Sequence, residues 1–301
     1  MRVLLVRHGE SVDNVAGLYA GSRDSPLTNH GVLQIKRLGA HLAKRQETIG
    51  PIKYIFTSNL QRAYQTAEAV AEALTEAQSS SSDDASRSQT PLEVSRLPQL
   101  REKDFGSFEG KKYGVKMGSS DDDQVQPDSE SHESMRIRVN RFMDSHLIPI
   151  TNTYVSENIT IVIVAHGIIL GILLKVFLER FPPKPALSTP HGGGQDGLPE
   201  FTTWSNTGVL QAKLELSKNL PSMDSPSKAV PSVDSISSDG DTVSSIGSHG
   251  KVLQLAVEFT NNLEHLNGLK KTRGGIGSAK FDSRQRTVDS FFSPASKKRK
   301  L

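Results

Sequence analysis

The chain contains no cysteine among its 301 residues. It therefore forms no disulfide bond or cysteine-ligated zinc site, and every mechanism that uses a thiol nucleophile is excluded. Long apolar runs are absent too, because none approaches the roughly 18 residues of a membrane span. The amino terminus enters an apolar segment without the pattern of a signal peptide. These absences predict an intracellular, soluble protein without membrane contact.

Hydrophobic residues make up only 35% of the chain, charged residues 23%, and the mean hydropathy is −0.39. This composition supports one sizeable core and leaves part of the chain too polar to fold. The net charge of +3 is unevenly distributed, because residues 270–301 contain ten Lys or Arg against two Asp. That tail carries +8 and leaves −5 for the rest, so the pI of about 9.0 describes the tail. No direct nucleic-acid site is predicted in the folded body.

The first fourteen residues combine an apolar segment with charged and polar groups. Met1 to Val6 is predicted to form a buried strand that places Arg7 and His8 at its carboxyl end, with Asn14 just beyond. Open α/β sheets bind ligands at this end. A fixed guanidinium beside an imidazole can hold a phosphoryl group while a ring nitrogen attacks it. Taken alone, such a pair is more often structural, with the histidine only capping its strand.

Three further motifs strengthen the chemical interpretation: Ser58 to Ala63, Leu100 to Gly110 and Val164 to Gly167. In this order they resemble the histidine phosphatase superfamily, which has the phosphoglycerate-mutase-like fold. The similarity is to the branch that contains mutases and fructose-bisphosphatase-like phosphatases, and it spans about residues 1–216. The resemblance implies an α/β protein, a three-layer α/β/α sandwich with a mostly parallel central sheet.

Apolar periodicity predicts the individual elements. Strands are expected at Ile52–Thr57, Leu92–Val94 and Ile159–Val164, with an edge pair at Thr207–Leu216 and Lys251–Phe259. Helices are expected after an N-cap at Thr28 and over residues 60–74, 133–154 and 168–178. The third helix follows Glu130-Ser131 and contains Arg138-Val139, which together are similar to a helix start common in this superfamily.

One catalytic domain is predicted over residues 1–266, followed by a disordered basic tail over 267–301. Insertions expected to be disordered lie at about residues 78–90, 117–132, 182–200 and 217–250.

The chemistry expected of these residues is covalent phosphoryl transfer. His8 attacks phosphorus in line and becomes a phosphohistidine. Arg7, Arg62 and a protonated His166 neutralise the equatorial oxygens, and Asn14 adds a neutral hydrogen bond. No metal ion or other cofactor is expected, because these groups supply the positive charge that Mg²⁺ supplies elsewhere.

Glu102 aligns with the general acid of the family. It would protonate the leaving oxygen and then, as a carboxylate, take a proton from the attacking water. Glu109 is the competing candidate, although the family pattern gives it a supporting position. The structural alternatives are a solvated surface carboxylate for Glu102, a core histidine for His166 and a surface arginine for Arg62.

Water is the expected phosphoryl acceptor. Phosphoglycerate mutases of this superfamily use extra basic residues after the acid motif, whereas Lys111 and Lys112 are followed here by acidic sequence, with no arginine pair before Arg136 and Arg138. The prediction is a phosphomonoesterase acting on a phosphorylated small molecule or phosphopeptide. The alternatives are a phosphoglycerate-mutase-type phosphotransferase, a metabolic sugar-phosphate phosphatase and a non-catalytic adaptor that binds a phosphorylated ligand.

Two tail motifs predict partners. Residues 285–292 resemble the peptide that binds the sliding clamp (PCNA), with Gln285 followed by the apolar side chains of Val288, Phe291 and Phe292.

The run at 297–300 resembles a nuclear import signal and predicts an import receptor as a partner; it consists of Lys297, Lys298, Arg299 and Lys300. A nuclear location is therefore predicted, with a cytoplasmic pool left open. The alternatives are coincidence for the first motif and a solvated charge run for the second.

Overall fold

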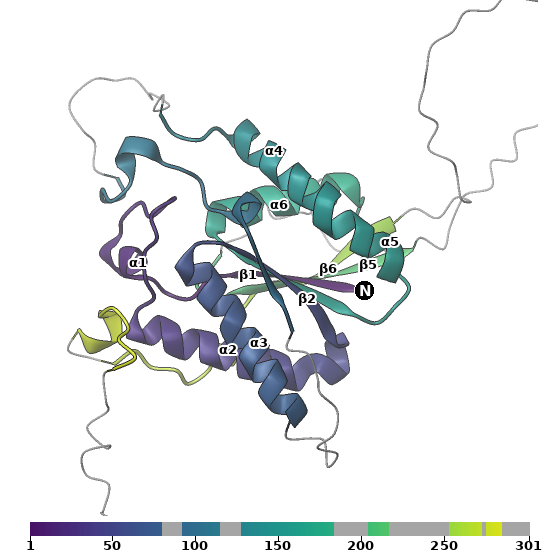
Figure 1. Cartoon of the computed structure of the whole chain (residues 1–301), viewed down its shortest axis with the longest axis horizontal. Helices are drawn as coiled ribbons and strands as arrows, with labels where there is room; N and C mark the ends of the chain where they lie inside the picture. The colour runs from purple at the N-terminus through teal and green to yellow at the C-terminus, as the bar shows by residue number, and fades with distance from the viewer. Residues whose placement is uncertain (80–91, 115–127, 184–203, 217–252, 273–274, 285–301) are drawn as a thin grey trace, which may run out of the picture.

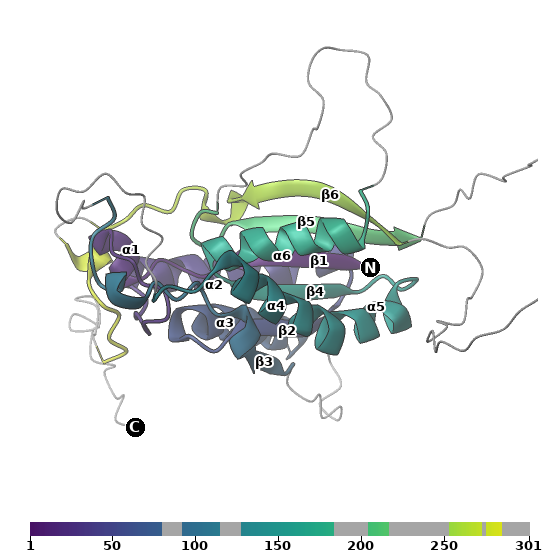
Figure 2. The same ribbon diagram turned by 90° about the horizontal axis from the view of Figure 1, so that it is seen from above.

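The computed structural model describes residues 1–79, 92–114, 128–183, 204–216, 253–272 and 275–284. They form a six-stranded sheet with the order β3-β2-β4-β1-β5-β6, covered by helices on both faces (Figures 1 and 2). The strands are β1 (Arg2–Arg7), β2 (Ile52–Ser58), β3 (Val94–Leu97), β4 (Thr160–Ala165), β5 (Val209–Leu216) and β6 (Leu253–Asn262). The first four run parallel, and β5 and β6 form the antiparallel edge pair. The expected three-layer, mostly parallel architecture is confirmed.

Helices divide between the two faces of the sheet. One face carries α2 (Asn29–Ile49) and α3 (Gln61–Ser79); the other carries α4 (His132–Phe142), α5 (Ile148–Tyr154) and α6 (Gly167–Arg180) (Figure 2). The short α1 (Val12–Ala16) follows β1 and precedes a loop that leads to α2. Single helical turns are η1 (Pro98–Leu100), η2 (Gly106–Phe108), η3 (Met143–Leu147), η4 (Glu264–Leu266) and η5 (Ile276–Ser278).

The core consists of two apolar layers, one on each side of the sheet. Along β1, Val3 and Leu5 face the layer under α4 and α6, whereas Leu4 and Val6 face the layer under α2 and α3. Every residue of β4 is buried. A strand that is buried on both faces needs a continuous apolar sequence, which is why β1 and β4 could be predicted from the sequence.

The helix expected over 133–154 is interrupted by one π-helical turn, η3, between α4 and α5. Pro149 lies in the first turn of α5 and has no N–H to donate to the carbonyl four residues earlier. The hydrogen-bond ladder therefore shifts there without ending the helix.

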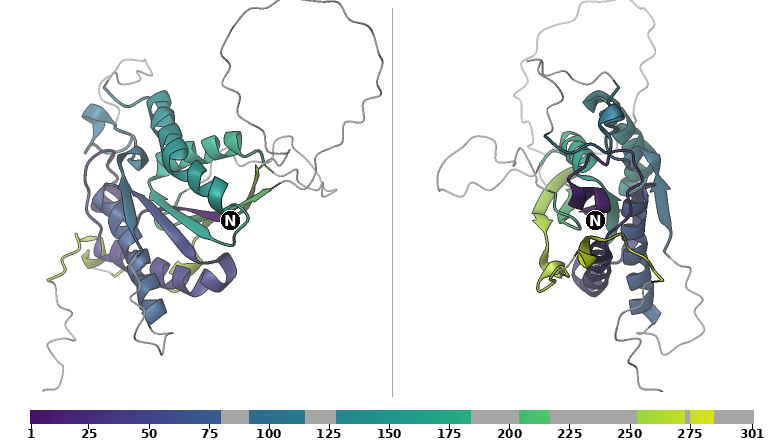
Figure 3. Two further views of the ribbon diagram at one scale, coloured as in Figure 1. Left: turned by 45° about the vertical axis from the view of Figure 1, so that its right-hand side comes forward. Right: turned by 90° about the vertical axis from the view of Figure 1, so that its left-hand side faces the viewer.

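The predicted tail boundary at residue 267 is too early. Residues 264–272 and 275–284 lie beside α1 and the start of α2 (Figures 1 and 3). Phe281 N–H donates to the carbonyl of Leu27 at 3.0 Å, and Asn29 N–H donates to the carbonyl of Ala279 at 3.0 Å. Backbone pairing of this kind leaves no apolar periodicity in the sequence.

The predicted insertions fall mostly outside the described residues, although α3 continues to Ser79 and α4 already begins at His132. The two tail motifs, at 285–292 and 297–300, lie wholly outside them. Among the helices that the structure describes, none has the length and apolar character needed to cross a membrane.

Candidate active site

Two histidines meet at the carboxyl ends of neighbouring parallel strands. β1 and β4 pair in register with Arg7 opposite Ala165, so the next residues are His8 and His166. His8 N–H donates to the carbonyl of Ala165 at 3.0 Å, and the two imidazole centroids lie 5.0 Å apart at 58°. Both side chains are buried. The sheet therefore brings the two histidines into one site, as the sequence predicts.

The surroundings of the His8 ring favour its neutral form. Its Nδ1 lies 2.7 Å from the carbonyl oxygen of Gly9, which can only accept a hydrogen bond. We therefore assign the proton to Nδ1, and this leaves the lone pair on Nε2. Burial lowers the pKa of His8 well below its ordinary value, and the cations Arg62 and Arg7 lower it further.

His166 has a similar environment. Burial lowers its pKa well below the ordinary value, and Arg62, His8 and Arg7 add to this effect. The ring is therefore neutral in this structure. Both of its nitrogens are buried and neither has a hydrogen-bond partner among the described residues. Buried polar atoms are costly to leave unpaired, so this ring is placed to receive a ligand.

Arg7 and Arg62 extend the site as fixed cations. Arg62, from the first turn of α3, is almost fully buried and donates to the carbonyls of Arg23 at 2.7 Å and Gly21 at 2.8 Å. Arg7 donates to the carbonyl of Trp204. In each guanidinium the buried Nε lacks a partner among the described residues. Burial lowers the pKa of Arg62 to about 10, so it stays charged at neutral pH.

Asn14 is held beside His8 by its side-chain oxygen. That oxygen accepts hydrogen bonds from Ser11 N–H and from the amide of Asn206, both at 3.1 Å. Asn206 also donates to the carbonyl of His8 at 3.1 Å. With the Asn14 oxygen occupied, the amide NH₂ is the group left to donate, in keeping with its expected role.

Glu102 lies at the amino terminus of α6, directly after His166. Its carboxylate accepts hydrogen bonds from Ile168 N–H at 3.1 Å and from Ile169 N–H at 3.2 Å. Burial lowers the pKa of Arg7 and of Arg62, and the nearby Glu102 carboxylate offsets part of this lowering. The expected acid therefore belongs to the same constellation.

Glu109 instead braces a loop. It accepts hydrogen bonds from the hydroxyl of Ser22 at 2.9 Å and from Phe105 N–H at 3.3 Å. These bonds tie the loop after α1 to the segment that carries Glu102. The geometry agrees with the supporting position that the resemblance gave to Glu109.

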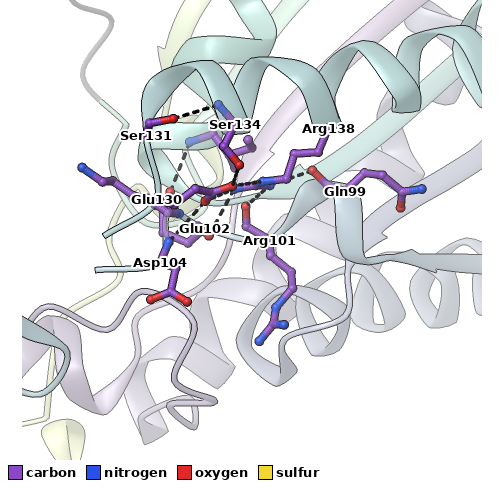
Figure 4. Close-up of polar contacts among 10 residues, drawn as sticks. Gln99, Arg101, Glu102, Asp104, Glu130, Ser131, Ser134 and Arg138 are labelled. Carbon is purple, nitrogen blue, oxygen red and sulfur yellow. Dashed lines mark hydrogen bonds and ion pairs between the residues drawn. The ribbon is translucent and has the colours of Figure 1, made fainter. Parts of the chain in front are cut away.

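Arg138 clamps the segment that carries Glu102 (Figure 4). It forms a two-pronged ion pair with Glu130 and donates to the carbonyls of Gln99, Arg101 and Glu102 at 2.6–3.2 Å. A cavity of about 480 Å³ beside this clamp is lined by Glu102, Arg101 and Asp104 among others. The sequence showed Glu130 and Arg138 only as signs of a helix start, because hydrogen bonds to backbone carbonyls carry no motif.

The contribution of residues 204–208 was missed from the sequence. Asn206 and Trp204 lie in a turn before an edge strand, with no charge or periodicity to draw attention to them. Within the part of the chain that the structure describes, no cluster of three or more carboxylate or imidazole groups could hold a metal ion.

Fold and site together define a class of protein. Two facing imidazoles, two buried guanidinium groups and one carboxyl group at the ends of parallel strands form an anion site suited to phosphoryl transfer. The sequence profile described as histidine phosphatase superfamily (branch 1) matches residues 3–193. The chain belongs to this family.

Individual relatives are similar over different extents. A probable phosphatase of Schizosaccharomyces pombe is 27% identical over 294 residues, which cover 96% of this chain and 79% of the relative. A probable phosphoglycerate mutase of Proteus mirabilis is 31% identical over 189 residues, covering 59% and 75%. A mycobacterial glucosyl-3-phosphoglycerate phosphatase structure has a TM-score of 0.48 at 22% identity, covering 70% of this chain and 89% of that one. Phosphatases and mutases thus both occur among its relatives.

The low pKa of His8 predicts how activity depends on pH. The ring stays neutral until the pH falls to its lowered pKa, so the acid limb of kcat/KM is expected well below pH 6.5. Folding stability should be more sensitive to acid than activity is. The unfolded chain binds protons at its histidines near pH 6.5, whereas burial keeps His8 and His166 unprotonated in the folded chain. The melting temperature should therefore fall as the pH drops below 6.5. A rate profile corrected for substrate ionisation, measured beside thermal melts, tests both; an acid limb at or above pH 6.5 contradicts this environment for His8.

Proposed function

We propose that the protein is a metal-independent phosphomonoester hydrolase that works through a phosphohistidine on His8. The observation that carries the proposal is the pairing of His8 with His166, whose ring centroids lie 5.0 Å apart, near Arg7 and Arg62, in each of which the Nε atom lacks a partner among the described residues. An adaptor needs only the cations to bind a phosphate. The intact nucleophile and the carboxyl of Glu102 favour catalysis.

The first step forms a phosphorus–nitrogen bond to His8 Nε2 and breaks the bond to the leaving oxygen. Glu102, protonated on the side of the leaving group, gives that oxygen its proton. The Nδ1–H bond to the Gly9 carbonyl stabilises the positive charge that develops on the ring. In the second step water attacks phosphorus, Glu102 takes its proton, the phosphorus–nitrogen bond breaks and neutral His8 returns.

His166 gains its proton when the substrate binds. Between Arg62 and Arg7 the ring is held neutral, because burial and the nearby cations both lower its pKa. A phosphate dianion in the same site offsets these cations and favours the imidazolium. The protonated ring then donates to an equatorial oxygen, which is the role that the sequence suggested.

Water is favoured over a second phosphate ester as the acceptor. A mutase holds a bisphosphorylated intermediate and needs spare cations beside the site. Arg136 is exposed and pairs with Glu179 at 2.7–2.8 Å, while Arg138 is fully engaged by Glu130 and three carbonyls. Neither arginine is free to bind a second phosphate group. This supports hydrolysis over the phosphoglycerate-mutase-type alternative.

A substrate panel with product analysis tests this assignment. Sugar monophosphates, sugar bisphosphates, 3-phosphoglycerate with a bisphosphoglycerate primer, and phosphopeptides should each be assayed with and without a chelator. Release of inorganic phosphate that is unaffected by the chelator is expected, with no isomerised phosphoglycerate. Isomerisation faster than phosphate release would instead establish the mutase alternative.

We propose further that the tail recruits the enzyme to the sliding clamp. The support is the sequence: the spacing of Val288, Phe291 and Phe292 after Gln285 would place three apolar side chains on one face of a helical turn formed on binding. Replacing both phenylalanines with alanine should weaken binding to purified clamp at least 100-fold, because such aromatic anchors dominate small interfaces. Titration of clamp with the full-length protein measures this. Ser290→Ala, at the position that a helical turn would place opposite the apolar side chains, is the matched control; equal affinity of the double variant and wild type would end the idea.

The run from Lys297 to Lys300 is proposed as a nuclear import signal, which supports a nuclear location. Its only support is the density of basic residues in a solvated tail. Deleting residues 297–301 from a fluorescently tagged chain should move the protein out of the nucleus. An unchanged distribution would leave the run as a solvated charge cluster.

A further inference from the structure

The turn at residues 204–208 holds the backbone of the proposed nucleophile. Thr207 N–H donates to the carbonyls of Arg7 at 3.0 Å and His8 at 3.2 Å. Asn206 adds a side-chain bond to the His8 carbonyl, and Trp204 accepts from the Arg7 guanidinium. The position of His8 is therefore fixed from a part of the chain beyond residue 193, where the family match ends.

Thr207 adopts a conformation that its side chain disfavours. Its φ is +58°, in the left-handed region that β-branched residues rarely enter, and it is fully buried. Such a conformation persists only where the surroundings over-determine it. Here the surroundings include the Thr207 hydroxyl itself, which donates to the carbonyl of Asn206 at 2.7 Å and lies 2.9 Å from His265 Nε2.

The hydrogen-bond roles within this pair follow from the chemistry of the groups. The single hydroxyl proton of Thr207 goes to a carbonyl, which cannot donate, so the hydroxyl oxygen must accept from His265. His265 thus carries its proton on Nε2. It lies in η4, packed against α2, where its ring centroid is 5.8 Å from that of His41.

His265 remains a neutral, constant donor over the working pH range. Burial lowers its pKa to about 4, with further contributions from His41 and Arg37, and no acidic group acts against them. The Nδ1 atom is buried without a partner among the described residues. This ring therefore has a single hydrogen-bonding task, the one directed at Thr207.

We propose that Thr207 and His265 are positioning residues for His8. The chain of bonds runs from His265 through the Thr207 hydroxyl to the strained turn, and from the turn's N–H and amide groups to the His8 carbonyl. It aims Nε2 at phosphorus without touching substrate. The inference rests on the proposed function, because it assumes that His8 is the nucleophile.

A purely structural role makes a different prediction. If these residues only fasten η4 to the turn at residues 204–208, their loss lowers the melting temperature and leaves the folded enzyme as fast as wild type. If they position His8, phosphorylation of the histidine slows while KM stays the same. Misplacing a reacting atom by about 1 Å can cost about 100-fold in rate.

The experiment compares single-turnover release of 4-nitrophenolate, which reports formation of the phosphohistidine, with KM and melting temperature. Thr207→Val and His265→Leu remove the hydrogen bond at nearly constant volume and should slow release about 10- to 100-fold with KM within about twofold. Thr207→Ser and His265→Gln keep the hydroxyl and the donor, and should stay within about threefold of wild type. His41→Leu alters the same packing without this bond and serves as the control.

Thr207→Gly keeps the test decisive where the valine variant does not fold. Glycine favours the positive φ, which offsets part of the cost of losing the side chain, but lacks the hydroxyl, so the folded protein should still react slowly. Full speed in the folded glycine and leucine variants overturns the positioning role. Equal losses in the conservative and non-conservative variants overturn it as well. Wild-type protein that forms no acid-labile phosphohistidine overturns the proposed function first, and this inference with it.

Discussion

His8→Ala is expected to lower phosphatase turnover by a factor on the order of 10⁴ or more, because it removes the atom that forms the covalent intermediate. The arginines and Glu102 remain, so substrate binding should change much less than kcat. Hydrolysis of 4-nitrophenyl phosphate measures turnover. Acid quenching after mixing with radiolabelled substrate should show an acid-labile protein-bound phosphate in wild type and none in the variant.

The matched control for this experiment is His132→Ala. His132 is exposed at the start of α4, outside the site, so its loss should leave turnover unchanged. Thermal melts of both variants establish that each is folded, since His8 is a buried side chain. A folded His8→Ala protein that hydrolyses phosphate esters at the wild-type rate would remove the phosphohistidine mechanism.

Glu102→Gln should produce an effect that depends on the leaving group. An alkyl alcohol leaves slowly without a proton, so kcat for alkyl phosphates should fall roughly 10²- to 10⁴-fold. The 4-nitrophenolate ion needs no proton, and release of this group in a single turnover should change little. The glutamine oxygen can still accept one bond from the start of α6, which keeps the side chain near its place.

The Glu109→Gln variant distinguishes the role of Glu109 from that of Glu102. The amide oxygen can keep the bonds that Oε1 accepts from the N–H groups of Ser22 and Phe105, and the amide NH₂ can donate to the Ser22 hydroxyl oxygen. The side chain connects two loops and is not assigned a contact with the reacting atoms. Any loss of rate should therefore be small and the same for alkyl and aryl substrates. If the leaving-group dependence appeared in the Glu109 variant and not in the Glu102 variant, the roles assigned to them would be exchanged.

The parts of the fold that could be predicted are those whose own residues carry a clear apolar run, apolar spacing or helix cap. β1 and β4 are continuous apolar runs that end in Arg7-His8 and Ala165-His166, and parallel pairing in register makes the convergence of the histidines almost unavoidable. The helices around them showed an N-cap and apolar spacing. Glu102 required the family resemblance, because nothing local distinguishes it from Glu109.

Hydrogen bonds between segments that are distant in the chain could not be predicted from the sequence. Arg138 donates to three backbone carbonyls. Asn206 donates to the carbonyl of His8, from which it is separated by nearly two hundred residues of chain, and Asn29 N–H donates to the carbonyl of Ala279. Such contacts need no particular composition on the carbonyl side. The lowered pKa of His166 in the ligand-free chain is not visible in the sequence, because a pKa depends on burial and on neighbouring charges that only the fold reveals.

The anchoring of residues 275–284 shortens the tether between the catalytic body and the proposed clamp motif. The N–H of Phe281 donates to the carbonyl of Leu27, which lies just before the start of α2. From that anchor to Phe291 the chain can stretch at most about 35 Å. A clamp bound to Phe291 and Phe292 would therefore keep the folded body close to the clamp surface, which would raise the effective concentration of phosphate esters presented there.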